Sequence, residues 1–310
     1  MHLPEAIGCK RGEALAFVGA GGKTGAMFAL AKALAPPVVL TTTTHLGAWQ
    51  AGLADVHLLI QSIDELNQVN FNQPRVILIT GPAGEDHRLA GLPDEALELL
   101  RQRCKENELP LLIEADGARQ RPLKAPAPYE PVIPDWASVV VVMAGLKGIG
   151  QPLDEKTVHR PEIFAKISGC VPGEPITAEH LQKVLASKQG GLKGIPTGAQ
   201  RIMILNQAEG ASRRAEGFHL ARRLMSVYDR VLVGSLHQPE QDGPVFSVHA
   251  QTAGVILAAG GSERLGRPKQ LLDWQGVPFV RQVVQNVLAA RLSPVIAVTG
   301  ADREGVESAL

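Results

Sequence analysis

Aromatic residues and cysteines are both scarce in this sequence. Phe, Trp and Tyr make up 4% of the 310 residues, although 45% are hydrophobic, so a core must be built from Val, Leu, Ile and Ala, as is typical of α/β proteins. The three cysteines, Cys9, Cys104 and Cys170, are scattered and contain no C-x-x-C pair. This pattern argues against a disulfide framework or a zinc site and favours a reducing compartment.

An excess of charge and long apolar runs are also lacking. The 31 basic and 31 acidic residues give a formal net charge of zero, so nothing in the composition attracts nucleic acid or an anionic membrane. The most apolar run, Val139 to Leu146, is far shorter than the ~20 residues of a membrane-spanning helix, and the first residues contain no apolar signal-peptide region. We therefore expect a cytoplasmic protein without nucleic-acid or membrane partners.

Short continuous apolar runs alternate with helical patterns along most of the chain. Continuous runs suit strands that are buried on both faces, and hence a mainly parallel sheet covered by helices. The predicted strands are Val38 to Leu40, Val76 to Ile79, Leu111 to Ile113, Val139 to Val142, Ile202 to Leu205 and Val231 to Val233. The predicted helices are Pro93 to Lys105, Ala178 to Ser187 and Ala211 to Val227. The order predicts an α/β, P-loop-like doubly wound sheet, whose ligand lies beyond the carboxyl ends of the strands.

The first strand, Ala14 to Val18, leads into a glycine-rich loop and then a helical pattern. The loop contains Gly19, Gly21 and Gly22, followed by Lys23 and Thr24. Glycines let successive amides face one anion, the lysine reaches terminal phosphates, and the threonine hydroxyl ligates Mg²⁺. Phe17 stands where the Walker pattern has its first glycine, so the loop departs from that pattern, and an ordinary Gly-rich turn is the alternative. We predict a nucleotide-phosphate site.

Polar residues follow two of the predicted strands. Glu114 and Asp116 come after the strand Leu111 to Ile113, in a position where a carboxylate binds Mg²⁺ or orients water in P-loop proteins, and as residues i and i+2 they can share one ion. We therefore predict Lys23, Glu114 and Asp116 as catalytic residues and Thr24, Glu114 and Asp116 as metal ligands, although both carboxylates could simply be solvated. Arg119, in the basic segment that follows, can contact phosphate or lie in solvent. Residues 41–44, four threonines, can face phosphate or cap the next segment.

These motifs together resemble one family. The segments GAGGKT, TTTT and EADGARQRPLKAP, with residues 158–162 (VHRPE), are similar to the YqeC family over roughly the first 235 to 250 residues. The resemblance implies a P-loop NTPase-like fold and an accessory role in the maturation of selenium-dependent molybdenum hydroxylases. It names no substrate, and it implies a nucleotide, Mg²⁺ with ATP or GTP, and a molybdenum hydroxylase or the molybdopterin cofactor as partners. His159 and Arg160 are expected near the site or at a helix start.

The strand Ile202 to Leu205 ends in Asn206, Gln207, Ala208 and Glu209. This resembles the N-K-x-D motif that reads guanine in many P-loop proteins, with Gln in place of Lys and Glu in place of Asp. We expect Asn206 to contact the nucleotide, with a polar strand-to-helix loop as the equal alternative and guanine specificity open.

A second domain is predicted to begin after an irregular stretch, residues 237–252. The strand Val255 to Leu257 leads into a loop that contains Gly260, Gly261 and Ser262, and Arg264 and Lys269 follow. This pattern resembles the start of MobA-like nucleotidyltransferases, including molybdopterin cytidylyltransferases. The resemblance implies that these residues bind CTP or another NTP. Relatives carry metal-binding carboxylates further along, so we expect residues 253–310 to be an incomplete Rossmann-like half-domain that does not transfer a nucleotide by itself.

The predicted organisation is an accessory domain at 1–236, a linker or edge strand at 237–252, and a transferase fragment at 253–310. The predicted function is that of an Mg²⁺-dependent NTP-binding accessory protein for molybdenum and selenium enzymes. Two alternatives stay open: CTP:molybdopterin cytidylyl transfer by the completed fusion, and a nucleotide-gated adaptor that does not hydrolyse its ligand.

Overall fold

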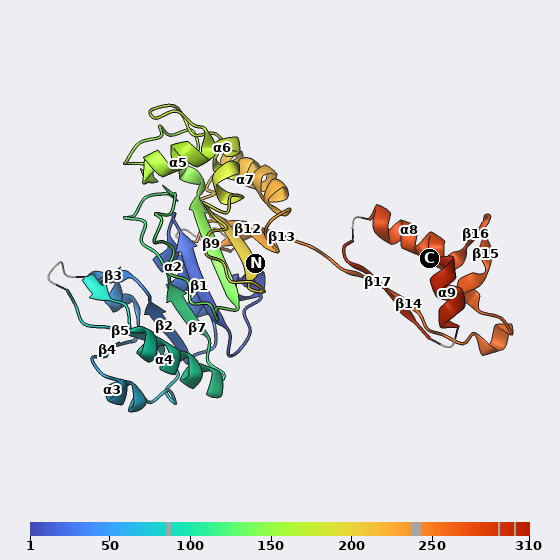
Figure 1. Ribbon diagram of the computed structural model, residues 1–310, viewed down its shortest axis with the longest axis horizontal. Helices are drawn as coiled ribbons and strands as arrows, with labels where there is room; N and C mark the ends of the chain where they lie inside the picture. The colour runs from blue at the N-terminus through green and yellow to red at the C-terminus, as the bar shows by residue number, and fades with distance from the viewer. Residues whose placement is uncertain (85–87, 237–242, 291, 301) are drawn as a thin grey trace. The chain divides into compact units, whose positions relative to one another are not determined.

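The chain divides into two compact units, Met1–His249 and Ala250–Leu310, in a computed structural model (Figure 1). The structure describes residues 1–84, 88–236, 243–290, 292–300 and 302–310. Part of the predicted linker, residues 237–242, lies outside the described residues.

In the described residues unit 1 is built on a nine-stranded sheet, which contains the seven predicted strands and adds β4 and β13 at its two edges. From one edge to the other the strands are β13 (Val245–Ala250), β12 (Arg230–Gly234), β11 (Gln200–Asn206), β9 (Val139–Gly145), β1 (Ala14–Gly19), β7 (Leu111–Glu114), β2 (Val38–Thr42), β5 (Val76–Thr80) and β4 (Val56–Leu59). The neighbours from β12 to β4 pair in parallel. The prediction of an α/β fold with a large, mainly parallel sheet is confirmed.

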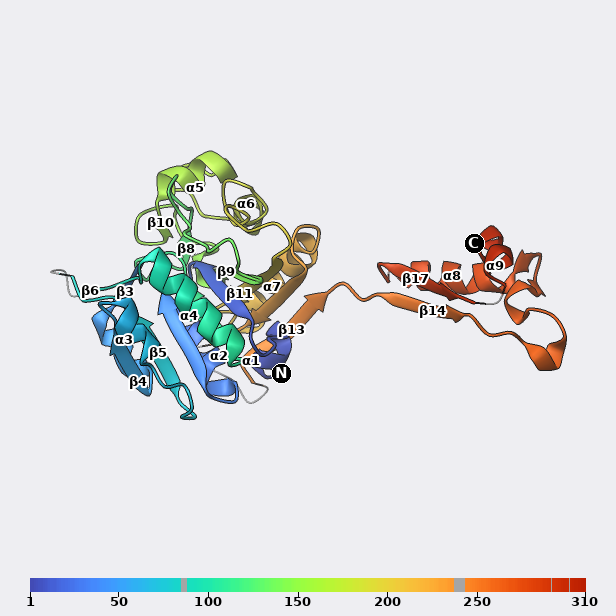
Figure 2. The same cartoon turned by 60° about the horizontal axis from the view of Figure 1, so that its bottom comes forward.

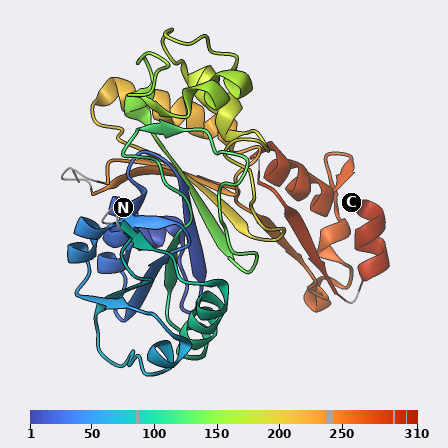
Figure 3. The ribbon, with the colours of Figure 1, turned by 60° about the vertical axis from the view of Figure 1, so that its left-hand side comes forward.

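Helices cover both faces of this sheet, because alternate residues of each strand point to opposite sides. Leu15 and Phe17 pack with α1 (Leu3–Ile7) and α2 (Lys23–Ala33) on one face. The other face carries two clusters. Ala16 and Val18 pack with the first, and the second lies over β7, β2 and β5. Five helices cover these clusters: α3 (Ile63–Asn67), α4 (Asp94–Glu106), α5 (Pro161–Ser168), α6 (Ala178–Leu185) and α7 (Ala211–Leu224). Figure 3 shows α5 and α6, in yellow-green, grouped together.

The strand order reverses at β1. After β1 the chain builds the sheet on one side through β2, β4, β5 and β7, and then crosses to the other side for β9, β11 and β12. The loops after β7 and β9 therefore leave on either side of the loop after β1. Ligands of open α/β sheets bind at this kind of switch point, beyond the carboxyl ends of the strands.

Two short strand pairs, which the periodicity of the sequence does not indicate, add to unit 1. Strand β3 (His45–Gly47) pairs antiparallel with β6 (Arg88–Ala90) and runs into the 3₁₀ helix η1 (Ala48–Leu53). Strand β8 (Leu123–Lys124) pairs in parallel with β10 (Val158–His159). Both pairs bring segments that are distant in sequence to the neighbourhood of the glycine loop, as the next section describes.

Unit 2 has a parallel pair of strands, β14 (Gly254–Ala258) and β17 (Val295–Thr299), with α8 (Phe279–Ala289) and α9 (Arg303–Ala309) on one side (Figure 2). A short hairpin joins β15 (Asp273–Trp274) to β16 (Val277–Pro278). Burial alternates along β14, so that Val255 and Leu257 are exposed, and Ile296 and Val298 lie opposite them in the register. One face of this small sheet is therefore apolar and uncovered within the unit. In both units together, none of the described helices has the length and apolarity needed to cross a membrane.

Candidate functional site

The loop after β1 bends sharply and presses against the end of β9. Gly19 and Gly21 have φ angles of 93° and 79°, a region that residues with a Cβ rarely adopt. A Cβ on Gly19 would lie 2.3 Å from the Met143 carbonyl oxygen, and one on Gly21 would lie 2.3 Å from the Gly145 amide nitrogen. The two glycines are required both by the backbone angle and by this close approach.

Hydrogen bonds to β9, to the segment after β7 and to Asn206 hold the loop in place. The Ala20 amide donates to the Met143 carbonyl at 2.9 Å, and the Gly21 amide donates to the Arg121 carbonyl at 3.1 Å. The side-chain amide of Asn206, which is fully buried, donates to the Gly21 carbonyl at 2.7 Å, and its oxygen accepts from the Leu236 amide. Asn206 therefore lies behind the loop and braces it.

The loop leads directly into the first turn of α2. Gly22 is the N-cap with a φ of 107°, and its carbonyl accepts from the Ala26 amide. The first four amides of a helix have no partner inside it and carry partial positive charge. In α2 these are the amides of residues 22–25, which follow the braced loop directly.

Lys23 is buried and turns back over the loop. Its ammonium donates to the Gly19 carbonyl at 2.7 Å and lies 3.1 Å from Asp116 Oδ1, while its side chain is 3% exposed. Burial works to lower the pKa of this ammonium, but the negative charges of Asp116 and Glu114 outweigh it, so the pKa is raised. Lys23 is therefore a protonated cation at the helix start.

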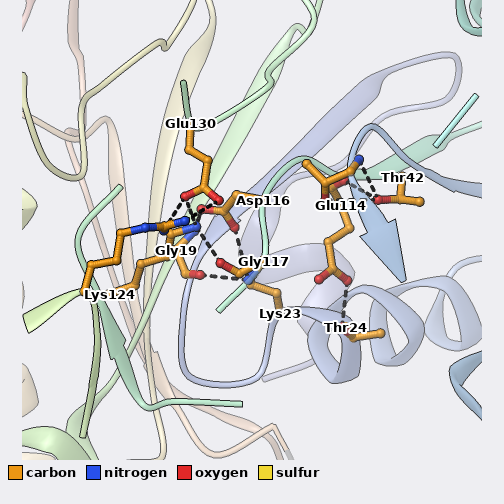
Figure 4. Close-up of polar contacts among 11 residues, drawn as sticks. Gly19, Lys23, Thr24, Thr42, Glu114, Asp116, Gly117, Lys124 and Glu130 are labelled. Carbon is orange, nitrogen blue, oxygen red and sulfur yellow. Dashed lines mark hydrogen bonds and ion pairs between the residues drawn. The ribbon is translucent and has the colours of Figure 1, made fainter. Parts of the chain in front are cut away.

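Asp116 is the centre of a chain of charged side chains, of which Lys23, Asp116 and Lys124 are buried and Glu130 and Arg160 partly buried. Its Oδ2 accepts from the Gly19 amide at 3.0 Å and lies 2.8 Å from Lys124 Nζ, whose side chain is 1% exposed. Lys124 also pairs with Glu130 at 2.7 Å (Figure 4). Glu130 in turn pairs with Arg160 at 2.7 Å. Burial works to raise the pKa of Glu130, but hydrogen bonds from Lys124 and Arg160 outweigh it and leave it lowered. We call these five residues, Lys23, Asp116, Lys124, Glu130 and Arg160, the charge cluster.

Glu114 belongs to a different contact. Its Oε2 accepts a 2.6 Å hydrogen bond from the Thr24 hydroxyl, and the Thr42 hydroxyl donates to its carbonyl at 2.9 Å. Figure 4 shows Glu114 directed toward Thr24, while Asp116 faces the two lysines. Burial raises the pKa of Glu114, and the nearby Asp116 adds to the rise, against the opposing effects of Lys23 and the Thr24 hydrogen bond.

A cavity of about 940 Å³ opens over this arrangement. Its floor includes Lys23, Thr24 and Glu114, and its walls come from Arg88 of β6 and from three other segments. These are residues 117–121 after β7, the segment from β3 into η1, and Gln207 after β11. A cavity of this size falls in the range of nucleotide and cofactor sites.

Most of the predicted residues of unit 1 meet at this cavity or directly behind it. Gly21, Gly22, Lys23, Thr24, Glu114 and Arg119 line it. Arg119 and Gln120 have φ angles of 47° and 59°, a backbone strain that is concentrated at functional sites. The roles assigned to these residues, and to Asp116 and Asn206 behind them, stay predictions.

Two threonines of the run, Thr42 and Thr43, form side-chain hydrogen bonds with backbone groups. The Thr42 hydroxyl bonds the Glu114 carbonyl, as noted above, and also accepts from the Thr44 amide, while Thr43 donates to the Val132 carbonyl. Whether residues 41–44 face a phosphate or metal or cap the next segment stays a prediction. Glu209 likewise bonds Ser235 and lies near Lys147 and Arg213, and it is not among the residues that line the cavity.

Two residues of the site, Lys124 and Trp49, are not predicted from the sequence. Lys124 stands in a basic loop that suggests solvent, yet it is buried against Asp116 and Glu130. Trp49 lines the cavity from η1, and 68% of it is exposed. Acidic residues lie on either side of Lys124 in the sequence, and they could have indicated its ion pairs. No periodic pattern surrounds Trp49, so the sequence offers no signal for its position.

The glycine loop of unit 2 has its own supports. The Gln270 side chain is buried and donates to the carbonyls of Ala258 and Gly260, and the Ser262 hydroxyl accepts from the Lys269 amide at 3.0 Å. Arg264 and Lys269 are exposed, and the Lys269 ammonium lies near Gly260. Gly260, Gly261, Ser262, Arg264 and Lys269 thus lie in or beside one loop, and their binding role stays a prediction.

This geometry defines the class of unit 1. It is an α/β protein with a braced glycine loop, a buried lysine and a helix N-terminus facing a cavity at the switch point of a parallel sheet. The family model described as YqeC protein matches residues 15–162. YqeC of Escherichia coli (strain K12) is 31% identical over 217 residues, which make up 67% of this chain and 82% of that protein. The chain belongs to the YqeC family.

Unit 2 is similar to a different group. The family model described as MobA-like NTP transferase domain matches residues 254–309. A probable molybdenum cofactor guanylyltransferase of Bacillus cereus (strain G9842) is 39% identical over 56 residues, 18% of this chain and 28% of that protein. A protein of the same name from Bacillus cytotoxicus is 52% identical over 33 residues, 11% of this chain and 17% of that protein. The chain thus spans less than a third of these relatives. No solved structure matches the chain.

Proposed function

We propose that unit 1 binds a nucleoside triphosphate with Mg²⁺ and acts as an accessory protein in the maturation of molybdenum enzymes. The observation that carries the nucleotide part is the first turn of α2. There, residues 22–25, whose amides have no partner inside the helix and which include Lys23 and Thr24, line one cavity, with the Lys23 ammonium held beside the loop at the Gly19 carbonyl. Amides at a helix start with a lysine beside them are a phosphate site.

Thr24 and Glu114 are the residues that would hold Mg²⁺. Among the described residues, no group of three or more His, Cys, Asp or Glu side chains is placed for a metal. Magnesium bound with a nucleotide needs no such group, because one or two protein oxygens, phosphates and waters complete its shell. The Thr24 hydroxyl and Glu114 Oε2, 2.6 Å apart, supply those protein oxygens. When bound, the ion would neutralise phosphate charge.

Asp116 has another task in this proposal. Its oxygens contact Lys23, Lys124 and the Gly19 amide, so it already has three positively polarised partners. It would therefore hold Lys23 over the loop and fix its charge, rather than reach the ion. Asn206 would position the Gly21 carbonyl in the same indirect way.

The link to molybdenum enzymes is supported by the two resemblances together. Unit 2 is similar to proteins named for guanylyl transfer to the molybdenum cofactor, and unit 1 belongs to the family whose likeness implies hydroxylase maturation. We propose that unit 2 binds an NTP through Ser262, Arg264 and Lys269, with GTP and CTP as the two candidates. Nucleotidyl transfer by a protein that contains the whole of this domain is the second candidate function.

A thermal-shift panel tests the nucleotide site. ATP, GTP and CTP, each with and without Mg²⁺, are added to the wild type, Lys23→Ala and Lys269→Ala, with the exposed Lys32→Ala as a control on the same helix. A ligand at a hundredfold excess over its Kd stabilises the folded state by about 2.7 kcal/mol. Stabilisation that disappears in Lys23→Ala but persists in the other two variants supports the site in unit 1. Stabilisation that survives Lys23→Ala and is lost in Lys269→Ala assigns the binding to unit 2 and refutes it for unit 1. Phosphate release by the wild type then separates an NTPase from a non-hydrolysing adaptor.

A further inference from the structure

The cavity extends well beyond its phosphate corner, to a wall formed by β3 and η1. This wall contributes Trp49, whose indole is 68% exposed although it lines a cavity. An aromatic side chain of this size is usually buried, because its transfer out of water is favourable. An accessible indole at the edge of a ligand-sized cavity therefore calls for an explanation.

The chain holds this indole through Gly47. Gly47 has a φ of −66°, an angle that any residue adopts, so the backbone does not require glycine here. A Cβ at this position would lie 2.9 Å from Trp49 Nε1, so an alanine here would displace the indole from its present position. The Gly47 amide also donates to Gln50 Oε1 at 2.9 Å. The absence of a side chain at Gly47 thus leaves the space that the indole ring occupies.

The charges around the ring favour an anionic ligand. Strand pairing places Arg88, another residue of the cavity wall, opposite Gly47. Arg119 and Arg121 line the same cavity as Lys23, and among the described residues that line it Glu114 is the one carboxylate. A flat apolar surface beside cationic groups suits a planar ring that carries phosphate.

We propose that Trp49 is a stacking platform for a planar heteroaromatic ring that bears phosphate, with Gly47 as the residue that sets the position of the indole. The proposal rests on the proposed function, because the phosphate corner is the one described above. Two sources can supply such a ring: the base of the NTP held by the glycine loop, or a second phosphorylated heterocycle bound beside it. The recognition chemistry is the same in both cases.

The test compares Trp49→Ala, Trp49→Phe and Gly47→Ala with the wild type, and uses Trp136→Phe as a matched control away from the cavity. Four ligands are titrated with Mg²⁺: ATP, GTP, inorganic tripolyphosphate, and GMP added to protein saturated with tripolyphosphate. Since Trp49 is largely exposed, its replacement should leave the melting temperature of the free protein unchanged.

Loss of a stacked ring weakens binding by about tenfold or more. If ATP or GTP binding falls by this factor in Trp49→Ala and Gly47→Ala, recovers in Trp49→Phe, and tripolyphosphate binding is unchanged, the ring is the base of the NTP. If ATP and GTP binding is unchanged but GMP binding to the tripolyphosphate-loaded protein falls, the ring belongs to a second ligand. Both results support the platform.

The platform is refuted if none of the four titrations changes in the Trp49 and Gly47 variants, or if tripolyphosphate binding falls with the rest. Failure of the phosphate site looks different, because tripolyphosphate then does not bind the wild type in a way that depends on Lys23. That result refutes the proposed function and this inference together.

Discussion

The Thr24 hydroxyl donates a 2.6 Å hydrogen bond to Glu114 Oε2, so the start of α2 and the end of β7 are joined by two oxygens of the kind that bind Mg²⁺. The two residues are 90 positions apart in the chain. Their meeting follows from the strand order, because β7 lies directly beside β1 and the strands run parallel. Substituting Glu114 should therefore change the effect of Mg²⁺ on nucleotide binding without altering the glycine loop, so the contributions of the ion and of the loop to binding can be measured separately.

Replacing Glu114 with Gln should remove the effect of Mg²⁺ on nucleotide binding without unfolding the protein. The amide keeps the size of the side chain and can still accept from Thr24, but it loses the negative charge. Since burial raises the pKa of Glu114, the charged form is costly in the free protein, and its removal should not lower the melting temperature. We expect nucleotide affinity measured with Mg²⁺ to fall about tenfold or more, to the value without Mg²⁺. The exposed Glu98→Gln is the control. A full Mg²⁺ effect in Glu114→Gln would exclude this ligand.

Asp116→Asn should destabilise the fold strongly. It leaves the buried ammoniums of Lys23 and Lys124, 3% and 1% exposed, with less negative charge. Breaking a buried ion pair in this way costs about 3–5 kcal/mol, measured by chemical denaturation. The exposed Asp135→Asn should stay within about 0.5 kcal/mol of the wild type.

The double variant Asp116→Asn with Lys124→Met should recover part of this loss, since one buried cation is removed together with its partner. If the two single changes simply add, Asp116 and Lys124 are not coupled, and the charge cluster does not stabilise the loop.

Asn206→Asp tests whether the residue behind the loop positions it. The carboxylate cannot donate to the Gly21 carbonyl and places negative charge beside its oxygen. We expect a loss of about 2–3 kcal/mol in stability and a nucleotide affinity that falls about tenfold. The Mg²⁺ effect should persist, because Thr24 and Glu114 are untouched. A variant that binds nucleotide normally would show that the loop does not need this brace, and the exposed Asn107→Asp controls for the change of charge.

The pH dependence of stability should change when His159 is replaced. Burial, together with the positive charges of Arg160 and Lys124, lowers the pKa of His159 from its ordinary 6.5 to about 4. Between these values the unfolded chain binds the proton and the folded protein does not, so stability falls as the pH decreases from 6.5 toward 4. In His159→Gln the melting temperature should decline less over this window. Since the pKa values of His57 and His249 are also lowered, the measured quantity is the difference between variant and wild type. Parallel curves would contradict the prediction.

The sheet could be predicted from the sequence, whereas the contacts within the site could not. Runs such as Val139 to Val142 are continuous and apolar because both faces of the strand are buried, and that pattern is visible in the letters. The glycine loop is likewise visible, since its glycines are required by backbone angle and close approach. The partners of Asp116 depend on tertiary packing: Gly19 lies 97 residues away, and Lys124 lies in β8, a two-residue strand that pairs with β10. The position of Trp49 depends on a pairing of three-residue strands, β3 and β6, which are too short to show a period.

The uncovered face of β14 and β17 should make the chain bind apolar probes. Leu257 is 80% exposed and lies opposite Val298, which is 41% exposed, so the two form an apolar pair on this face. Replacing both with Thr keeps the β-propensity of the strands and removes apolar surface. We expect the fluorescence of the dye ANS, and light scattering on concentration, to fall, with the secondary structure unchanged by circular dichroism. Ile256→Thr is the matched control, because this residue is 9% exposed and packs on the opposite face of the same strand. There the hydroxyl enters the core, so ANS fluorescence should rise. If the double variant binds as much ANS as the wild type, this face is covered in solution.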